Sequence, residues 1–157
     1  INMNEWFNCK ISFLKQLENG TITKKAENYL VNAMTFTEAE ARLHSILEEY
    51  ISDFQLLTCA KTKVNGIMID ESKDKFYKTK VVFPSFDEET GKEKKAVEMY
   101  IIQANSLKEA YERTEQKMAG SVVDWDIPSI NEFNVVDIFP YEAGAIPNKK
   151  AAKQEEE

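Results

Sequence analysis

The chain has few of the residues on which most catalytic and metal sites depend. Its 157 residues include one histidine, two cysteines and five glycines. A single histidine argues against histidine-rich zinc sites and Ser-His-Asp triads, and so few glycines argue against a phosphate-cradling loop. Walker, Gly-x-Gly-x-x-Gly, Gly-x-Ser-x-Gly and Cys-x-x-Cys motifs do not occur in it. The sequence therefore predicts no catalytic residues, no metal and no cofactor, and a protein that is not an enzyme.

The chain also lacks an excess of basic residues and a long apolar run. Its formal net charge of −7 disfavours generic binding to duplex DNA, although a local basic site stays open. No apolar run approaches the roughly 20 residues that span a bilayer. Trp6-Phe7 is followed by polar residues and not by the apolar stretch of a signal peptide. We therefore expect a cytoplasmic protein with no membrane partner.

The two cysteines suit a reducing compartment. Cys9 and Cys59 each lie in an apparent strand. We interpret both as small core residues, and a disulfide or a metal-binding pair is the alternative.

The most informative feature present is a unit that occurs twice. Residues 29–33, Tyr-Leu-Val-Asn-Ala, return 71 positions later as residues 100–104, Tyr-Ile-Ile-Gln-Ala. Upstream, residues 10–13, Lys-Ile-Ser-Phe, match residues 80–83, Lys-Val-Val-Phe. An internal repeat of this length predicts architecture well and chemistry poorly.

Each copy predicts the same series of elements. Residues 7–13 and 77–83 alternate in polarity, which is typical of half-buried strands, and a glycine-containing hairpin leads from each to a return strand. Thr35 and Ser106 each carry a hydroxyl and are followed three positions later by a glutamate. This pattern predicts the start of an amphipathic helix at both residues. Two short strands close each copy. Pro128 predicts an edge or a bulge for the strand that contains it.

These elements predict an α+β fold. We expect a tandem β-β-α-β-β repeat, with antiparallel sheet(s) and both amphipathic helices packed on one side, related by a pseudo-two-fold axis. The first copy spans 3–70 and the second 75–141. They are expected to form one joint globular unit, because a half of about 70 residues buries little core. Residues 142–157 are expected to form a disordered tail, because the chain from Asn148 onward lacks apolar anchors.

Three segments together resemble one known family: residues 3–10, residues 29–41 and residues 136–141. It is an uncharacterised family of small proteins, a domain of unknown function, found in crAss-like phages and in Bacteroides genomes and mobile elements. The resemblance covers almost all of residues 3–141. Its motifs encode folding and not chemistry, so it implies no functional residues. It implies a phage or mobile-element accessory protein that acts in the cytoplasm of a bacterial host.

Two groups of residues could carry chemistry, and each has a plainer explanation. His44 lies one helical turn from Glu40 and from Glu48, a row that could ligate a metal, but a solvated charged face explains it as well. Asp124 and Asp126 flank Trp125 and could serve acid–base or metal chemistry. A solvated edge strand accounts for them equally.

The best candidate surface lies on the strands. The candidate anion- or nucleic-acid-binding residues are Lys10, Lys61, Lys63, Lys78, Lys80 and Tyr77. We expect the lysines to form a basic patch on a sheet face that the helices leave open, with Tyr77 near enough to stack on a base. Ordinary lysine placement on an exposed sheet, including edge protection, is the alternative.

The favoured function is a non-catalytic binding module that engages a host or phage protein, with homo-oligomerisation left open. A repeated scaffold without a reactive constellation motivates this hypothesis. The alternative is a binder of single-stranded nucleic acid or of a small anionic nucleotide through the lysine-bearing strands.

Overall fold

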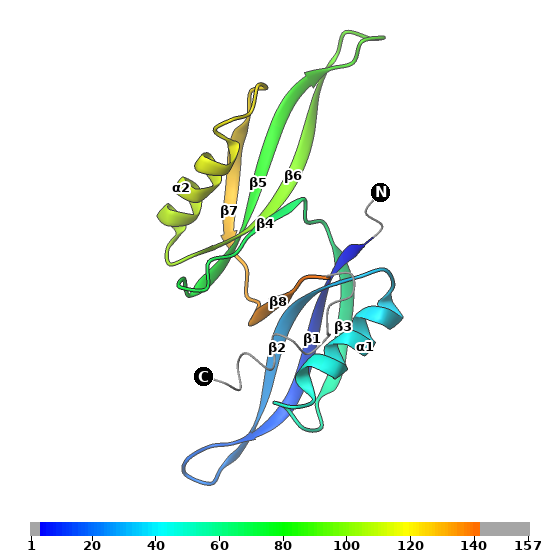
Figure 1. Ribbon diagram of the computed structural model, residues 1–157, viewed down its shortest axis with the longest axis vertical. Coiled ribbons are helices and arrows are strands. Elements are labelled where there is room, and N and C mark those ends of the chain that lie inside the picture. Colours follow the sequence, from blue (N-terminus) through cyan, green and yellow to red (C-terminus); the bar gives the residue numbers. More distant parts are fainter. Residues whose placement is uncertain (1–3, 142–157) are drawn as a thin grey trace. The chain divides into compact units, whose positions relative to one another are not determined.

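The computed structural model describes residues 4–141, and the predicted tail at 142–157 lies outside the described residues. The described chain is an α+β protein with two helices and two four-stranded sheets (Figure 1). Its elements are β1 (Glu5–Gln16), β2 (Ile22–Ala33), α1 (Phe36–Leu47), β3 (Gln55–Thr62), β4 (Gly66–Met68), β5 (Lys75–Phe86), β6 (Glu93–Ala104), α2 (Leu107–Met118), β7 (Asp126–Glu132) and β8 (Asp137–Phe139). Neither of these helices is long and apolar enough to cross a membrane.

The described residues divide into two compact units, each built around one sheet. Unit 1 comprises residues 4–62 and 135–141 of the described chain, and unit 2 comprises Lys63–Asn134. The tandem repeat with copies at 3–70 and 75–141, their union in one globular body and the pseudo-two-fold axis stay predictions.

The fourth strand of each sheet comes from the other half of the chain. β8 pairs with β2 in unit 1, β4 pairs with β6 in unit 2, and both pairings are parallel. The prediction of antiparallel sheets is therefore wrong at these two strands, and each sheet is mixed. A parallel neighbour requires a crossover rather than a tight hairpin, and the crossovers here are the connections that lead from one unit to the other.

In unit 1 the strand order is β3-β1-β2-β8, and α1 packs on one face of the sheet. The helix begins after Thr35, whose hydroxyl accepts a hydrogen bond from Glu38 N at 3.1 Å, as the sequence predicts. The apolar stripe of α1 faces the alternating apolar side chains of β1 and β2. The core comprises Phe7, Cys9, Ile11, Tyr29, Val31, Ala33, Ala39, Leu43, Ile46, Leu47, Phe54 and Phe139.

In unit 2 the strand order is β4-β6-β5-β7, and α2 packs on the sheet in the same way. The Ser106 hydroxyl accepts a hydrogen bond from Glu109 N at 3.1 Å, so this predicted N-cap also forms. Leu107 and Tyr111 are large apolar or aromatic residues of α2, but both are exposed. The buried residues of α2 are Ala110, Thr114 and Met118.

The strands β3 and β7 lie at sheet edges, and each contains a bulge. The register with β3 shifts between Lys10 and Ile11 of β1, and the register with β7 shifts between Lys80 and Val82 of β5. Pro128 lies in the bulged part of β7, in agreement with the prediction of an edge or a bulge. Because proline has no N–H to donate, an interrupted edge strand accommodates it without loss of a ladder hydrogen bond.

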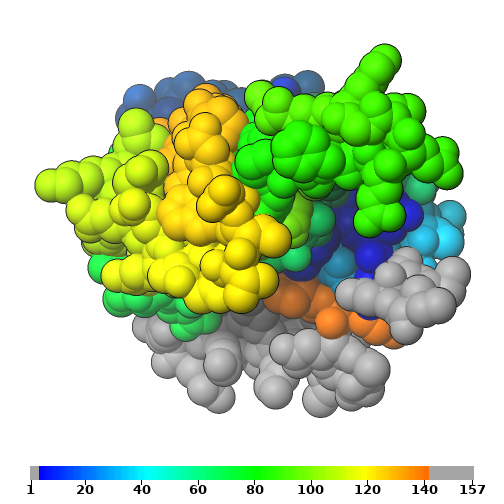
Figure 2. Space-filling model, turned by 90° about the horizontal axis from the view of Figure 1, so that it is seen from above, coloured from blue at the N-terminus to red at the C-terminus, as the bar shows by residue number. Residues whose placement is uncertain are grey.

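Both hairpins extend beyond the rest of their units. β3 pairs with β1 only as far as Ser12, and β7 pairs with β5 only as far as Val82. The remaining two-stranded parts are called arm 1 (residues 13–25) and arm 2 (residues 83–96). Both arms run past the helix of their unit, and the tip of arm 2 projects away from α2 and β7 (Figures 1 and 2).

Candidate functional site

Two of the six predicted site residues lie in unit 1, on opposite faces of its sheet. Lys10 alternates with the buried Cys9 and is exposed on the face away from α1. Lys61 pairs with Phe7 in the β1–β3 register and therefore lies on the helix-covered face. Its ammonium is 3.0 Å from the Glu5 carboxylate, which offsets its charge locally.

Two further predicted lysines lie side by side on one face of β5. Lys78 and Lys80 are both half-buried and alternate with core residues of unit 2. The Lys78 ammonium lies 5.6 Å from the centroid of the Phe133 ring, a cation–π contact. Burial lowers the pKa of Lys78. This pair is the closest approach to the predicted basic patch within one unit.

The other two predicted residues are held by contacts of their own. Tyr77 is 4% exposed and packs with Ala104 and Ala110 on the helix-covered face of β5. The Lys63 ammonium donates a hydrogen bond of 2.6 Å to the carbonyl of Val97. The six residues are thus divided between two units and two sheet faces, and their role in binding stays a prediction.

The candidate acid–base residues are dispersed over the surface. The ring of His44 stacks on that of Phe54, with centroids 4.5 Å apart. Asp124 and Asp126 are both exposed at the start of β7. Within residues 4–141, no group of three or more His, Cys, Asp or Glu side chains could hold a metal ion.

Cys9 and Cys59 are directly opposite each other on β1 and β3. Their sulfur atoms lie 3.2 Å apart, and both thiols are free. Burial, followed by the contact with Cys59, raises the pKa of the Cys9 thiol well above its ordinary value. A buried thiol with a raised pKa reacts slowly, so Cys9 serves as a core residue.

Sequence reasoning missed the role of the two arginines, Arg42 and Arg113. Arg42 reaches from α1 to the carbonyl oxygens of Asn32, Phe139 and Pro140, which it joins by hydrogen bonds. It thereby ties β2 to the end of β8. A signal was available, because these are the only arginines in the chain and they lie 71 positions apart.

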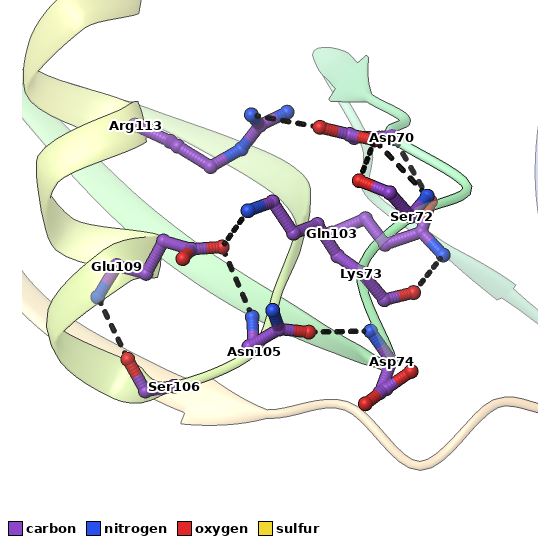
Figure 3. Close-up of polar contacts among 9 residues, drawn as sticks. All are labelled: Asp70, Ser72, Lys73, Asp74, Gln103, Asn105, Ser106, Glu109 and Arg113. Carbon is purple, nitrogen blue, oxygen red and sulfur yellow. Dashed lines mark hydrogen bonds and ion pairs between the residues drawn. The ribbon is translucent and has the colours of Figure 1, made fainter.

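Arg113 belongs to a polar network that fixes the loop before β5 (Figure 3). Its guanidinium lies 3.7 Å from the carboxylate of Asp70, and Lys73 forms an ion pair of 3.2 Å with Glu109. Gln103 connects the two halves of the network, since it accepts from Asp70 N at 2.9 Å and donates to the Lys73 carbonyl at 3.1 Å. The network anchors the loop between β4 and β5 to β6 and α2.

A concave feature of unit 1 lies between the end of α1 and the sheet strands β1, β2 and β8. Its volume is about 290 Å³. The phenol of Tyr29 donates a hydrogen bond of 2.7 Å to Glu27, and its ring stacks on Phe139 at 5.6 Å. Asp137 is buried in the wall. The pocket is lined by Phe13, Glu27, Tyr29, Ile46, Leu47, Tyr50, Ile51, Val136, Asp137 and Phe139.

Arm 1 exposes large apolar side chains. Leu14 is 72% exposed and Ile22 is 64% exposed. Leu14 pairs with Lys24 and Gln16 pairs with Ile22 in the β1–β2 register, so the two apolar side chains are diagonal neighbours on the face away from α1. Phe86, 73% exposed, is the corresponding feature of arm 2.

These features define a small α+β protein with two mixed sheets. It has a pocket lined in part by two carboxylates, and two hairpin arms that expose apolar side chains. The chain belongs to the family described as Domain of unknown function (DUF4494), which it matches over residues 5–141. A search of curated proteins found no match.

Proposed function

We propose that this protein is a non-catalytic binding module that engages a host or phage protein through arm 1. The observation that carries this proposal is the pair of exposed apolar side chains, Leu14 and Ile22, on a two-stranded hairpin. Single exposed apolar residues are ordinary on protein surfaces. Two large ones, adjacent on the same face of a projecting arm, are typical of a contact that a partner completes.

The backbone of arm 1 supports the same proposal. Beyond Ser12, β1 has lost its β3 neighbour, and β2 meets β8 only from Tyr29 to Val31. Both outer edges of the arm therefore carry backbone donors and acceptors that no third strand of the described chain occupies. An extended segment of a partner can pair with such an edge while its side chains contact Leu14 or Ile22.

The charges of arm 1 indicate the chemistry of the partner surface. Lys15, Lys24 and Lys25 outnumber the single acid of the arm, Glu18. Two copies of arm 1 meeting about a two-fold axis would bring like charges together. A different protein with an apolar patch and an acidic rim fits better, and charge complementarity would raise its association rate.

The proposal extends to the origin of the chain. The sequence resemblance stated above supports a protein of phage or mobile-element origin that acts in the cytoplasm.

A duplicated β-β-α-β-β unit is also part of the proposal. It is supported by matching strand orders in the two sheets and by helices of 12 residues in both units.

Binding of a single-stranded nucleic acid or a small anionic nucleotide is the second candidate. It is supported by Lys78 and Lys80, which share one face of β5 with Phe76. This candidate requires salt-sensitive binding, which the first does not.

The test compares partner recovery by three forms of the full chain expressed in a Bacteroides host. The forms are wild type, Leu14→Ser with Ile22→Ser, and Val122→Ser with Val123→Ser. The last is a matched control, because Val122 and Val123 are exposed apolar residues outside both arms. We expect a protein recovered with wild type and with the control to be lost with the arm variant. Equal recovery by all three forms, or purified wild type that only self-associates through arm 1, would contradict the proposal.

A further inference from the structure

The two cysteines of the chain meet on the neighbouring strands β1 and β3 of unit 1 (Figure 1). Cys9 and Cys59 are partners in the register of these strands, and their sulfur atoms lie 3.2 Å apart. They are 50 positions apart in the sequence, so the fold and not the local sequence brings them together. All the thiol groups of the protein are therefore concentrated at one point.

The backbone places this pair at a site where a cross-strand disulfide fits. Leu17 N donates to the Thr21 carbonyl at 2.7 Å, and the β1–β2 ladder alternates from this bond along an unbroken register. The N–H and C=O groups of Cys9 therefore face β2 and not β3. Cys9 and Cys59 thus form a non-hydrogen-bonded pair, in which opposite Cα atoms lie about 4.5 Å apart. A disulfide joins Cα atoms about 4.4–6.8 Å apart, so the strands can stay paired when it forms.

The two thiols differ in their access to solvent. Cys9 lies on the inner strand β1 and is 0% exposed. Cys59 is half-buried on the edge strand β3, between the exposed residues Thr58 and Ala60. Burial, followed by the contact with Cys59, raises the pKa of the Cys9 thiol and keeps it protonated. A reagent in solution therefore meets Cys59 first.

Unit 2 has no sulfur at the corresponding pair. Thr79 and Ile130 are opposite each other on β5 and β7, where unit 1 has its two cysteines. Thr79 is fully buried, and Ile130 packs against the core of unit 2. A hydroxyl and an aliphatic side chain thus satisfy the packing at this position. The fold does not require thiols here, so the property that distinguishes the unit 1 pair is its chemistry.

We propose that Cys59 and Cys9 are a redox-active dithiol that reduces a low-molecular-weight disulfide and becomes an intrachain disulfide. The Cys59 thiolate attacks one sulfur of the small disulfide, forms a mixed disulfide and releases a thiolate, which takes up the proton that Cys59 lost. The Cys9 sulfur then attacks the Cys59 sulfur, and the second small thiol leaves with the proton of Cys9. The cysteines lose two electrons, and the small disulfide gains them as two thiols. The contact of 3.2 Å makes the second step intramolecular, which compensates for the low reactivity of Cys9.

The disulfide holds the edge strand β3 on the sheet. It closes a loop from residue 9 to residue 59 that contains β2 and α1, which is most of unit 1. A cross-link over such a loop restricts the unfolded chain and stabilises the native state. The last pair of β1 and β3 is Ser12 with Gln55, where arm 1 begins. The redox state of the dithiol therefore determines how firmly β3 is held beside the base of arm 1.

Oxidation of the full chain with oxidised glutathione tests the proposal. We expect one intrachain disulfide per monomer, seen as a loss of two hydrogens from the intact mass and as protection of both cysteines from iodoacetamide in denaturant. The melting temperature should rise by about 5–15 °C over that of the reduced protein. Hydrogen exchange should slow at Thr58 and Ala60, whose register places their amides toward β1, and stay unchanged at Ser129 and Asn131 of β7. An unchanged mass, disulfide-linked dimers, or an oxidised form with the melting temperature of the reduced protein would overturn the proposal.

Two variants test the order of the two steps. Cys9→Ala removes the second thiol, so oxidised glutathione should leave a stable mixed disulfide at Cys59. Cys59→Ala removes the accessible thiol, so the buried Cys9 should stay unmodified until the protein is denatured. Unmodified Cys59 in the first variant, or glutathione on Cys9 in the folded second variant, would overturn the assigned roles. Cys9 belongs to the core, and the wild-type measurements keep the test valid if Cys9→Ala does not fold.

Discussion

The hydroxyl oxygens of Thr79 and Thr114 lie 3.2 Å apart in the fully buried core of unit 2. Thr114 is also 2.8 Å from the carbonyl of Ala110, one turn earlier in α2. Because a hydroxyl has one proton, Thr114 donates to Ala110 and accepts from Thr79. In unit 1, Cys9 pairs with Tyr29 as Thr79 pairs with Tyr100, and Leu43 occurs 71 positions before Thr114. The corresponding contact there is apolar.

Thr114→Val should destabilise the protein by about 1–3 kcal/mol, because it leaves the buried Thr79 hydroxyl without an acceptor. Thr79→Val should cost less, since Thr114 keeps its bond to Ala110. The double variant should be close to wild type, because both polar groups are removed together. Urea unfolding of the four proteins gives the coupling energy. Additive losses would show that the two hydroxyls do not depend on each other.

Gly66→Ala should destabilise the protein by about 1–3 kcal/mol, because the added Cβ would lie 2.8 Å from the buried Tyr100 ring. Gly120→Ala is the matched control. A Cβ there meets no atom within 4 Å, and Gly120 does not have a positive φ. The control should be neutral or slightly stabilising. Thermal unfolding of both variants checks the difference, and equal melting temperatures would count against this close approach.

Arg42→Met should destabilise the protein by about 2–3 kcal/mol, since it removes the donor that joins the carbonyls of Asn32, Phe139 and Pro140. Arg113→Met should cost less, because Arg113 has one ion pair, at 3.7 Å, and its buried Nε has no hydrogen-bond partner among the described residues. Denaturant unfolding of the two variants gives the order. A larger loss for Arg113→Met would refute this account of how β8 is held.

The nucleic-acid alternative predicts a particular salt dependence. If Lys78 and Lys80 each neutralise a phosphate, Lys78→Ala with Lys80→Ala should weaken binding of oligothymidylate and reduce the slope of log K against log salt by about 1.4. Lys94→Ala with Lys95→Ala removes the same charge from arm 2 and should change both quantities less. Fluorescence anisotropy at several salt concentrations measures them. Absence of binding by wild type would remove this alternative.

The local elements were predictable from the sequence. Alternation over residues 7–13 and 77–83 identified the first strands, and the hydroxyl residues Thr35 and Ser106 identified both helix starts. These signals arise from neighbouring residues, which is why they can be read from one chain. Pairing of the three-residue strands β4 and β8 depends on segments distant in sequence, and their apolar residues do not specify the parallel neighbour.

The candidate site was less predictable for the same reason. The sequence assigned Tyr77 to base stacking. In the alternation of β5, however, Tyr77 lies on the sheet face that α2 covers. The unit 1 pocket combines residues from β1, β2, α1 and β8, so no single segment contains it.

The most direct test of the binding-module proposal is site-specific photo-crosslinking from arm 1. A photoreactive amino acid replaces Leu14 in one form of the full chain and Val122 in another, and both are irradiated in the expressing host. The proposal predicts an adduct with a different protein from position 14, at an apolar surface with acidic neighbours, and no such adduct from position 122. The same adducts from both positions, or none from position 14, would contradict it.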